Sequence, residues 1–192
     1  DYVNQDADNA VMRTDFLDRE RIRLRGAWEP AKWFRISATA EEIDTENEDA
    51  GYGLDGKVKT YAGDLELGPW NWLRLRFGMG RFEADNSIPY RVPQTFQTAT
   101  SIYTETGDSM EGGITLNLKP FTVEALLRHF ENEGSFPYEL DRARVRADLE
   151  FSKLVGIAAE WDLDDYTEKN RSYGSGADYR ASRYGLYLRI HP

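Results

Sequence analysis

The sequence has 192 residues, of which 40% are hydrophobic, 30% are charged and 13% are aromatic, with a formal net charge of −10. The five Trp, eleven Tyr and nine Phe residues argue against disorder, and the absence of cysteine excludes disulfides, thiolate zinc sites and cysteine nucleophiles. The mean hydropathy of −0.67 and the longest apolar run, Leu154 to Ala159, exclude a membrane-spanning helix.

Apolar residues alternate with polar or charged residues along nine segments, which is the period of β-strands. No stretch of ten or more residues shows a sustained helical period. Because a membrane barrel also alternates lipid-facing and lumen-facing residues, a low mean hydropathy is compatible with it. In chain order, the predicted strands cover residues 16–28, 34–40, 57–67, 73–80, 114–118, 121–127, 144–151, 157–163 and 183–190.

The third segment departs from a simple alternation. Its apolar positions change parity between Val58 and Tyr61. We expect a β-bulge near Ala62 and Gly63, since one extra residue in a strand would produce this shift.

The connections fall into two sets that alternate along the chain. Soluble sandwiches with Greek-key connections do not sort their loops in this way, whereas outer-membrane barrels have short periplasmic turns and long external loops. The sequence therefore predicts an all-β, antiparallel, up-and-down transmembrane β-barrel in the outer membrane. The short turns are at 29–32, 68–71, 119–120 and 152–155, and the long acidic or Gly-rich loops at 41–55, 83–99, 131–140 and 165–178.

Aromatic residues support this prediction, because two girdles at the membrane interfaces are typical of barrels. Alternatively, aromatics only mark the strand ends of a soluble sheet. The first expected girdle, beside the short turns, comprises Trp28, Trp33, Trp70, Trp72, Phe121 and Phe151. The second, toward the long loops, comprises Tyr103, Trp161, Tyr166 and Tyr179.

The polar face of the strands would line the lumen. Its arginines either pair with carboxylates across strands, which we favour because acids are nearly as abundant there, or attract anions. The predicted lumen-lining residues are Arg19, Arg21, Arg23, Arg25, Arg74, Arg76, Arg144, Arg146, Glu150 and Glu160.

The strand count bears on completeness. Nine strands are an odd number, whereas complete bacterial barrels have an even number, and residues 1–12 resemble another external loop. We therefore expect residues 1–192 to form a single β-barrel segment, a contiguous part of a larger wall. Pairing between the first and last strands would instead indicate closure within the chain.

Catalytic motifs are absent, so we expect no enzymatic activity. The two histidines, His129 and His191, lie in no ligand or triad spacing, and Gly78-Met79-Gly80 is not followed by a helix. We expect these glycines to let a neighbouring side chain approach. No metal or cofactor site, including haem attachment, is predicted in this chain, and the negative charge argues against nucleic acid as a partner.

The segment Arg81-Phe82-Glu83-Ala84-Asp85-Asn86-Ser87-Ile88-Pro89-Tyr90-Arg91 resembles the loop entries of the outer-membrane barrels of the MtrB/PioB type, which associate with decahaem cytochromes. The later segments 128–133 and 164–170 are similar in style. This resemblance implies a large barrel that sheathes a multihaem cytochrome, so that haem would be carried by the partner. It also implies that the charged rows contact a protein plug.

Three hypotheses follow from the sequence. The first is an outer-membrane barrel acting as a non-enzymatic conduit shell, with membrane lipid outside and a multihaem cytochrome or another barrel-filling protein inside. The second is a porin or polysaccharide-export channel in which Arg21, Arg23, Arg74 and Arg76 set anion preference. The third is a soluble extracellular β-sandwich or adhesion module.

Overall fold

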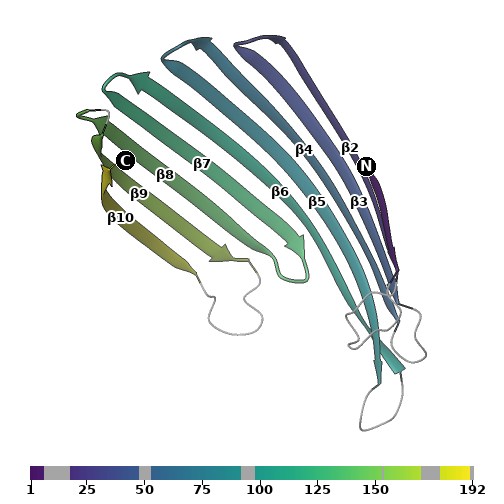
Figure 1. Ribbon diagram of the computed structural model, residues 1–192. Coiled ribbons are helices and arrows are strands. Elements are labelled where there is room, and N and C mark those ends of the chain that lie inside the picture. The colour runs from purple at the N-terminus through teal and green to yellow at the C-terminus, as the bar shows by residue number, and fades with distance from the viewer. Residues whose placement is uncertain (7–17, 48–52, 92–97, 153, 170–177, 191–192) are drawn as a thin grey trace.

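The computed structural model describes residues 1–6, 18–47, 53–91, 98–152, 154–169 and 178–190. These residues form one sheet of ten strands (Figure 1). The strands are β1 (Tyr2–Asp6), β2 (Asp18–Ala31), β3 (Phe34–Asn47), β4 (Leu54–Trp70), β5 (Leu73–Arg91), β6 (Thr98–Leu118), β7 (Phe121–Gly134), β8 (Tyr138–Glu150), β9 (Val155–Glu168) and β10 (Tyr179–Ile190).

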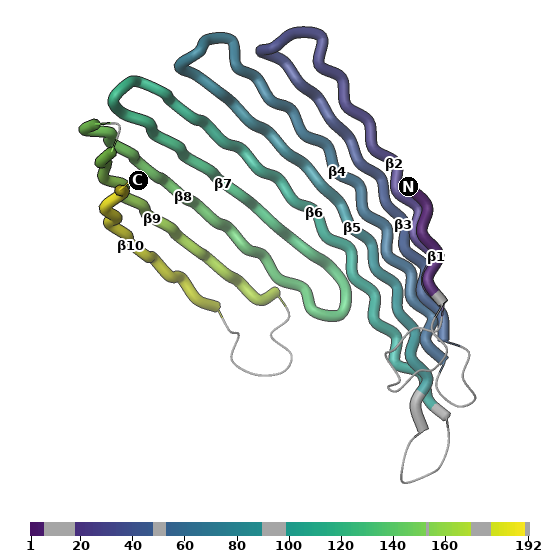
Figure 2. Tube along the Cα trace, viewed as in Figure 1, coloured from purple at the N-terminus to yellow at the C-terminus, as the bar shows by residue number. Residues whose placement is uncertain are grey.

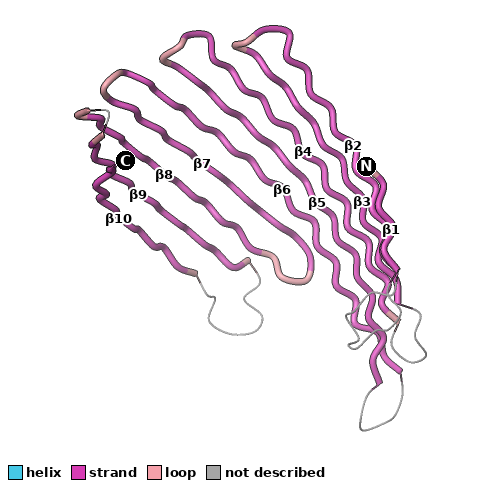
Figure 3. The backbone as a smooth tube through the Cα atoms, viewed as in Figure 1, coloured by secondary structure: helices cyan, strands magenta, loops and turns pink. Residues whose placement is uncertain are grey.

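Each strand pairs in antiparallel fashion with its neighbours in sequence, from β1 at one edge to β10 at the other, as the tube in Figure 2 shows. The described residues contain no helix, and hence none long and apolar enough to cross a membrane (Figure 3). Within these residues β10 does not pair with β1 or β2. The prediction of an all-β, up-and-down antiparallel architecture is confirmed.

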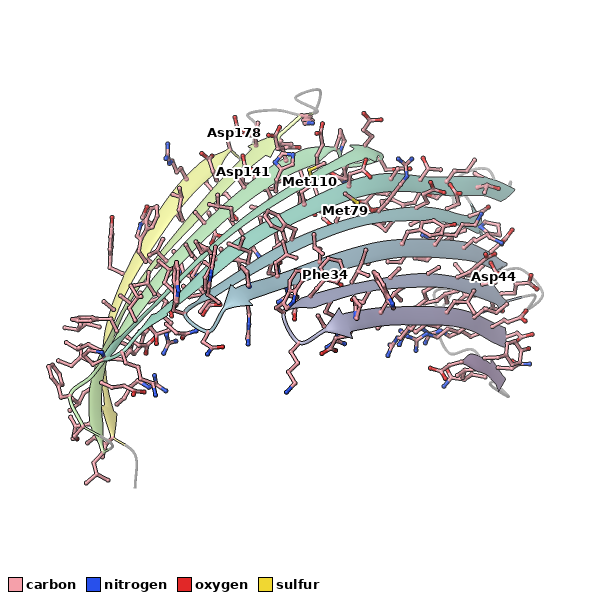
Figure 4. The ribbon with its side chains drawn as sticks, turned by 90° about the horizontal axis from the view of Figure 1, so that it is seen from above. Phe34, Asp44, Met79, Met110, Asp141 and Asp178 are labelled. Atoms are coloured by element: carbon pink, nitrogen blue, oxygen red, sulfur yellow. The ribbon has the colours of Figure 1, made fainter. Side chains whose placement is uncertain are left out.

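The sheet is a single curved layer without a conventional core. Seen from above, it bends into an arc (Figure 4). Among the described residues, only Ala84 and Ala158 are buried apolar side chains. A β-sandwich would bury the facing sides of two sheets, which this layer cannot do. The structure therefore gives no support to the soluble sandwich.

The first strand was not expected. Tyr2–Asp6 pairs with residues 18–22 of β2, so the prediction that residues 1–12 form only an external loop is wrong for these five residues. Residues 7–12 and Phe16 lie outside the described part of the chain. The segment is short and polar, and backbone pairing with β2 rather than an apolar pattern makes it a strand.

The strands are longer at the loop end than the sequence predicted. β3 continues to Asn47, β5 to Arg91 and β9 to Glu168, so much of each expected long loop is antiparallel strand. The alternation of apolar and polar residues fades in these extensions, while the backbone pairing continues. The expected loop tips at 48–52, 92–97 and 170–177, like the chain end at 191–192, lie outside the described residues.

The connection between β7 and β8 is a tight turn, although we had expected a loop over 131–140. Gly134 has a φ of 124°, and a Cβ there would lie 2.1 Å from the carbonyl oxygen of Thr104, so only glycine fits. The buried Asn132 side chain donates to the carbonyl of Phe136 (3.0 Å) and accepts from the amide of Tyr138 (2.6 Å). These contacts stabilise the tight turn between β7 and β8 although the segment is polar.

The short turns lie close to their predicted positions. The reversals are at 32–33, 71–72, 119–120 and 151–154, so β2 runs through Pro30 and β4 runs through Pro69 before the chain turns. The register slips between Trp28 and Ala31 and between Leu67 and Trp70. Proline cannot donate a ladder hydrogen bond, and such irregular positions accommodate it.

The expected bulge near Ala62 and Gly63 is wrong. The register of β4 is continuous with β3 from Leu54 to Leu67 and shows no shift against β5 over Asp55 to Leu67. Val58 and Tyr61 therefore project from opposite faces of an unbroken strand. The change in apolar parity needs another explanation, which the two faces of the sheet provide.

Candidate functional site

One face of the sheet carries an apolar belt that crosses nine strands. In β6 the belt runs from Met110 to Leu118, nine residues or about 27 Å of strand, close to the length of a transmembrane β-strand. Its side chains are open, with Leu127 63% and Leu186 78% exposed. Partners in register include Leu65 with Phe77, Leu75 with Ile114, Ile114 with Ala125, Val145 with Trp161, and Ala159 with Leu186.

Toward the loop end, the same face becomes charged on successive strands at one level. On each of these strands the last small or apolar residue of the belt is followed, two positions away on the same face, by a charged residue or histidine. The pairs are Ala40 and Glu42, Tyr61 and Lys59, Met79 and Arg81, Met110 and Asp108, Leu127 and His129, Ala143 and Asp141, and Leu163 and Asp165. We call these charged residues, with Asp44, Lys57, Glu83, Glu131, Glu139, Lys169 and Arg180, the charged band. A common level on so many strands is expected where a sheet leaves the hydrocarbon layer.

The charged band is internally paired. Lys57 pairs with Glu42 and Asp44, and Lys169 pairs with Glu131. The Lys57 ammonium lowers the pKa of Glu42, and the Lys169 ammonium lowers that of Glu131. These side chains are exposed, so each pair adds little stability, and together they form a hydrated rim.

Six aromatic residues cluster at the short-turn end, as expected for the first girdle. Trp28, Trp33, Trp70, Trp72, Phe121 and Phe151 are between 44% and 62% exposed. The Trp70 and Trp72 rings stack with centroids 5.4 Å apart, and Phe34 meets Trp28 edge-on at 5.8 Å. Amphipathic indoles at this level are typical of a membrane interface.

The second girdle is wrong for three of its four residues. Trp161 lies in the apolar belt, but Tyr166 lies five positions further along β9 and faces the other side. Tyr179 is in register with Tyr166 and shares its face, and Tyr103 is on that face of β6. These three residues lie near the loop end of their strands, as predicted, but they project from the face of the sheet opposite to the apolar belt.

The opposite face carries the predicted lumen residues. We call this opposite face the inner face. The register places Arg19, Arg21, Arg23, Arg25, Arg74, Arg76, Arg144, Arg146, Glu150 and Glu160 on it. Their role as the lining of a lumen remains a prediction.

Most of these arginines are ion-paired. Arg21 and Arg23 share Glu41, and Arg144 Nε lies 2.7 Å from Asp162 Oδ1. Arg146 contacts Asp148 at 2.9 Å and Glu160 at 3.4 Å. Of the two alternatives drawn from the sequence, the geometry favours pairing.

Three predicted residues stand apart from the network. Arg25 and Arg74 form no ion pair with any described residue, and Glu150 forms none either. Arg76 makes only long contacts, 3.7 Å to Glu111 and 3.9 Å to Asp64.

Sequence reasoning missed further members of the network. Arg142 Nε lies 2.9 Å from Asp164, and Arg189 Nη1 lies 2.7 Å from the same Asp148 that binds Arg146. The signal was present, since Arg142 continues the alternation of Arg144 and Arg146. It was overlooked because the predicted strand began at residue 144, six residues after the start of β8 at Tyr138.

The middle of the inner face is shallow across β3 to β6. Small residues replace large ones there, and they are Ser37, Thr39, Thr60, Ala62, Gly78, Gly80, Gly107, Ser109 and Gly113. Ser109 Oγ lies 2.8 Å from where a Cβ of Gly80 would stand, so the expected approach of a neighbouring side chain is confirmed at this glycine. Large charged residues on β7 to β10 flank this shallow floor.

Above the arginines, at the level of the charged band, the inner face becomes apolar. Five rings form a continuous row, which we call the inner aromatic wall: Phe82, Phe130, Tyr138, Tyr166 and Tyr179, with successive centroids 5.2 to 5.9 Å apart. Phe82 reaches Phe130 across β6 because Gly107 has no side chain; a Cβ there would lie 2.2 Å from the ring.

The two faces therefore exchange polarity at one level. Across β3 to β10 the outer face is apolar and the inner face is charged below this level, whereas above it the outer face is charged and the inner face is mainly apolar. On β2 the inner face stays charged, since Arg21 is in register with Ile43. Ile43, Val58 and Ala84 belong to the upper inner face, in register with one another. This exchange explains the change in parity along β4 without a bulge.

His129 lies in the charged band, continuing the face of Leu127 as the sequence indicated. Its Nδ1 is 2.7 Å from Asp141 Oδ1, and the Asp141 carboxylate raises the pKa of the imidazole. Ligand atoms of His129, Glu139 and Asp141 lie within 4.8 Å of one another. Asp141 is exposed, His129 and Glu139 are half-buried, and Glu139 Oε1 lies 4.0 Å from His129 Nδ1.

No family model and no curated protein matches this sequence. Among solved structures, the chain is similar to the copper transporter OprC, with a TM-score of 0.55 and 11% identity over 89% of this chain. It is also similar to the siderophore receptor PiuA from Acinetobacter baumannii, with a TM-score of 0.51 and 7% identity over 89% of this chain. The chain spans 32% and 38% of these two proteins.

At such low identity the similarity concerns the fold alone. The fold is the antiparallel up-and-down sheet of outer-membrane β-barrels. The neighbours support this architecture in general and do not single out the MtrB/PioB type.

Proposed function

We propose that this chain forms part of the wall of an outer-membrane β-barrel, and that the barrel is a non-enzymatic shell around a protein in its lumen. The apolar belt, its sharp charged boundary and the aromatic cluster at the short-turn end support the membrane location. The belt matches the height of the hydrocarbon band of such barrels.

The two edges of the sheet support a larger wall. In lipid every backbone N–H and C=O must be hydrogen-bonded, so an open edge does not persist in the hydrocarbon layer. The free edges of β1 and β10 would therefore pair with further strands beyond the described sheet. The open edges thus support a contiguous segment of a barrel, but the odd count of nine strands from which we expected one is wrong, since the described residues form ten strands.

The inner aromatic wall is the observation that favours a protein in the lumen over water. In a water-filled lumen, five adjoining aromatic rings would expose apolar surface to water, which is unfavourable. The surface of a protein in the lumen could cover these rings. Below the wall, paired arginines and carboxylates leave few free charges for a passing anion. The shallow floor of small residues would leave room for a partner to approach the backbone.

The resemblance to the MtrB/PioB type identifies the partner in this proposal as a multihaem cytochrome. The haem would belong to that partner, and this chain would insulate it from lipid. The haems of the partner would then carry electrons across the membrane, and this chain would form the sheath around the partner.

A second candidate is a porin or polysaccharide-export channel. Arg25 and Arg74 favour it, because they are inner-face cations without an ion pair among the described residues. Such cations could attract an anionic solute.

Photo-crosslinking from neighbouring residues on opposite faces tests the proposal. A benzophenone amino acid at Ala62 on the inner face should capture a second protein in intact cells, and the same group at Gly63 on the outer face should not. The captured complex should show haem absorbance. A colourless protein that gives no crosslink from Ala62 and conducts ions in planar bilayers would contradict the shell and favour the channel.

A further inference from the structure

The apolar belt is interrupted by a hollow on its outer face. The hollow has a volume of about 890 Å³, within the range of ligand-binding clefts. Its apolar lining includes Leu24, Ala40, Tyr61, Gly63, Met79 and Met110. Met79 and Met110, labelled in Figure 4, are in register on β5 and β6 and both line it.

A row of small residues produces the hollow. Gly26, Ala38 and Gly63 are partners in register on three adjacent strands, so the row carries no side chain larger than a methyl group. The row below it, through Ile36 and Leu65, carries large side chains. A Cβ added to Gly26 would meet no atom within 4 Å, and the nearest side-chain atom to one at Gly63 would be Met79 Cγ at 3.9 Å.

The hollow is open toward the charged band at its loop-side end. Arg81 lies there and contacts Glu83 at 3.1 Å and Asp108 at 3.8 Å, with half of its side chain exposed. Such exposed ion pairs are weak, so the guanidinium can exchange them for a phosphate, which it can bind in bidentate fashion. Glu131, at the same end, is paired with Lys169 and does not leave this end strongly anionic.

An apolar hollow that ends at an arginine on the membrane boundary fits a lipid. We propose that it holds an acyl chain of lipid A, the phosphorylated glycolipid of the outer leaflet, with a lipid phosphate against Arg81. The choice of leaflet follows from the loop side, which faces outward in outer-membrane barrels. This inference rests on the proposed membrane location and is independent of what fills the lumen.

The test is the amount of lipid A that remains with the full chain after extraction from its own outer membrane in a mild detergent, measured by mass spectrometry. Filling the hollow with Gly26→Leu and Gly63→Leu should reduce the retained lipid A about tenfold. Gly112→Leu is the control, since Gly112 lies in the same belt with equally open space but lines a separate, smaller hollow beside Leu127. Arg81→Gln, in the exposed band, should also reduce it without affecting folding.

The outcomes separate this inference from the proposed function. Membrane fractionation of the same cells reports the location independently. Equal lipid A in the wild type, the filled variant and Arg81→Gln would overturn the inference while leaving an outer-membrane barrel intact. Loss of lipid A in the Gly112→Leu control to the same extent, or retention of phospholipid in place of lipid A, would also overturn it.

Discussion

Val58 and Tyr61 lie three positions apart on β4 and project from opposite faces of the sheet, although both are apolar. Tyr61 closes the apolar belt on the outer face, one step before Lys59 begins the charged band. Val58 lies on the inner face with Ile43 and Ala84. The pair marks the level at which the outer face changes from apolar to charged and the inner face ceases to be charged.

A charge placed within the apolar belt should destabilise the protein far more than a charge above it. Phe77 lies near the middle of the belt and is 49% exposed. In a bilayer, Phe77→Lys should cost about 2–4 kcal/mol. Thr106→Lys, on the same face beside Glu83 and Glu133, should have little effect. Urea unfolding in lipid vesicles would measure both, and equal costs would contradict the belt.

The inner network should hold β10 in place through Asp148. Its carboxylate accepts hydrogen bonds from Arg146 on its own strand and from Arg189 on β10, across the intervening β9. Asp148→Asn removes the charge that both guanidiniums share and should cost about 1–3 kcal/mol. Amide hydrogen exchange should rise most in β10. Glu150→Gln, on the same face without an ion pair among the described residues, is the control, and an identical exchange pattern in both variants would oppose this role.

Ion selectivity should depend little on the inner arginines. Because the account fills the lumen with protein, the wild type, Arg74→Ala and Arg76→Ala with their partner bound should all conduct little in planar bilayers, and a salt gradient should reveal no ion preference that depends on these arginines. A shift toward cation preference in both variants, together with high conductance of the wild type, would support the channel instead.

His129 should make the charged band sensitive to pH. Asp141, and to a lesser degree Glu139 and Glu131, raise the pKa of His129, so the folded state favours the imidazolium. Its contribution to stability is therefore complete below the unfolded pKa of about 6.5 and is lost as the pH rises through the higher folded pKa. The unfolding midpoints of the wild type and His129→Gln should differ at acidic pH and converge at alkaline pH. A difference that grows with pH would show the opposite coupling.

The alternation of side chains was predictable within the apolar belt. Leu73, Leu75, Phe77 and Met79 lie on one face as predicted, because successive side chains of a β-strand point to opposite faces of the sheet. The short turns were also predictable, because proline and small polar residues interrupt the alternation there.

Features set by long-range packing were not predictable. The strand extensions from Glu42 to Asn47 and from Glu83 to Arg91 lack a lipid-facing pattern, so their polar composition suggested loops. The inner aromatic wall also escaped prediction, because Phe82 and Phe130 become neighbours only through the register of β5, β6 and β7 across Gly107. The partners of individual arginines depend on the same register.

The central claim, that the two faces exchange polarity at a membrane boundary, can be tested along one strand. The chain contains no cysteine, so single cysteines from Leu73 to Asp85 can each carry a spin label in the vesicle-embedded protein. Accessibility to oxygen should peak at residues 73, 75, 77 and 79, and accessibility to a water-soluble nickel complex should peak at 81, 83 and 85. Equal access of the nickel complex to both sets of positions would contradict a membrane-spanning belt.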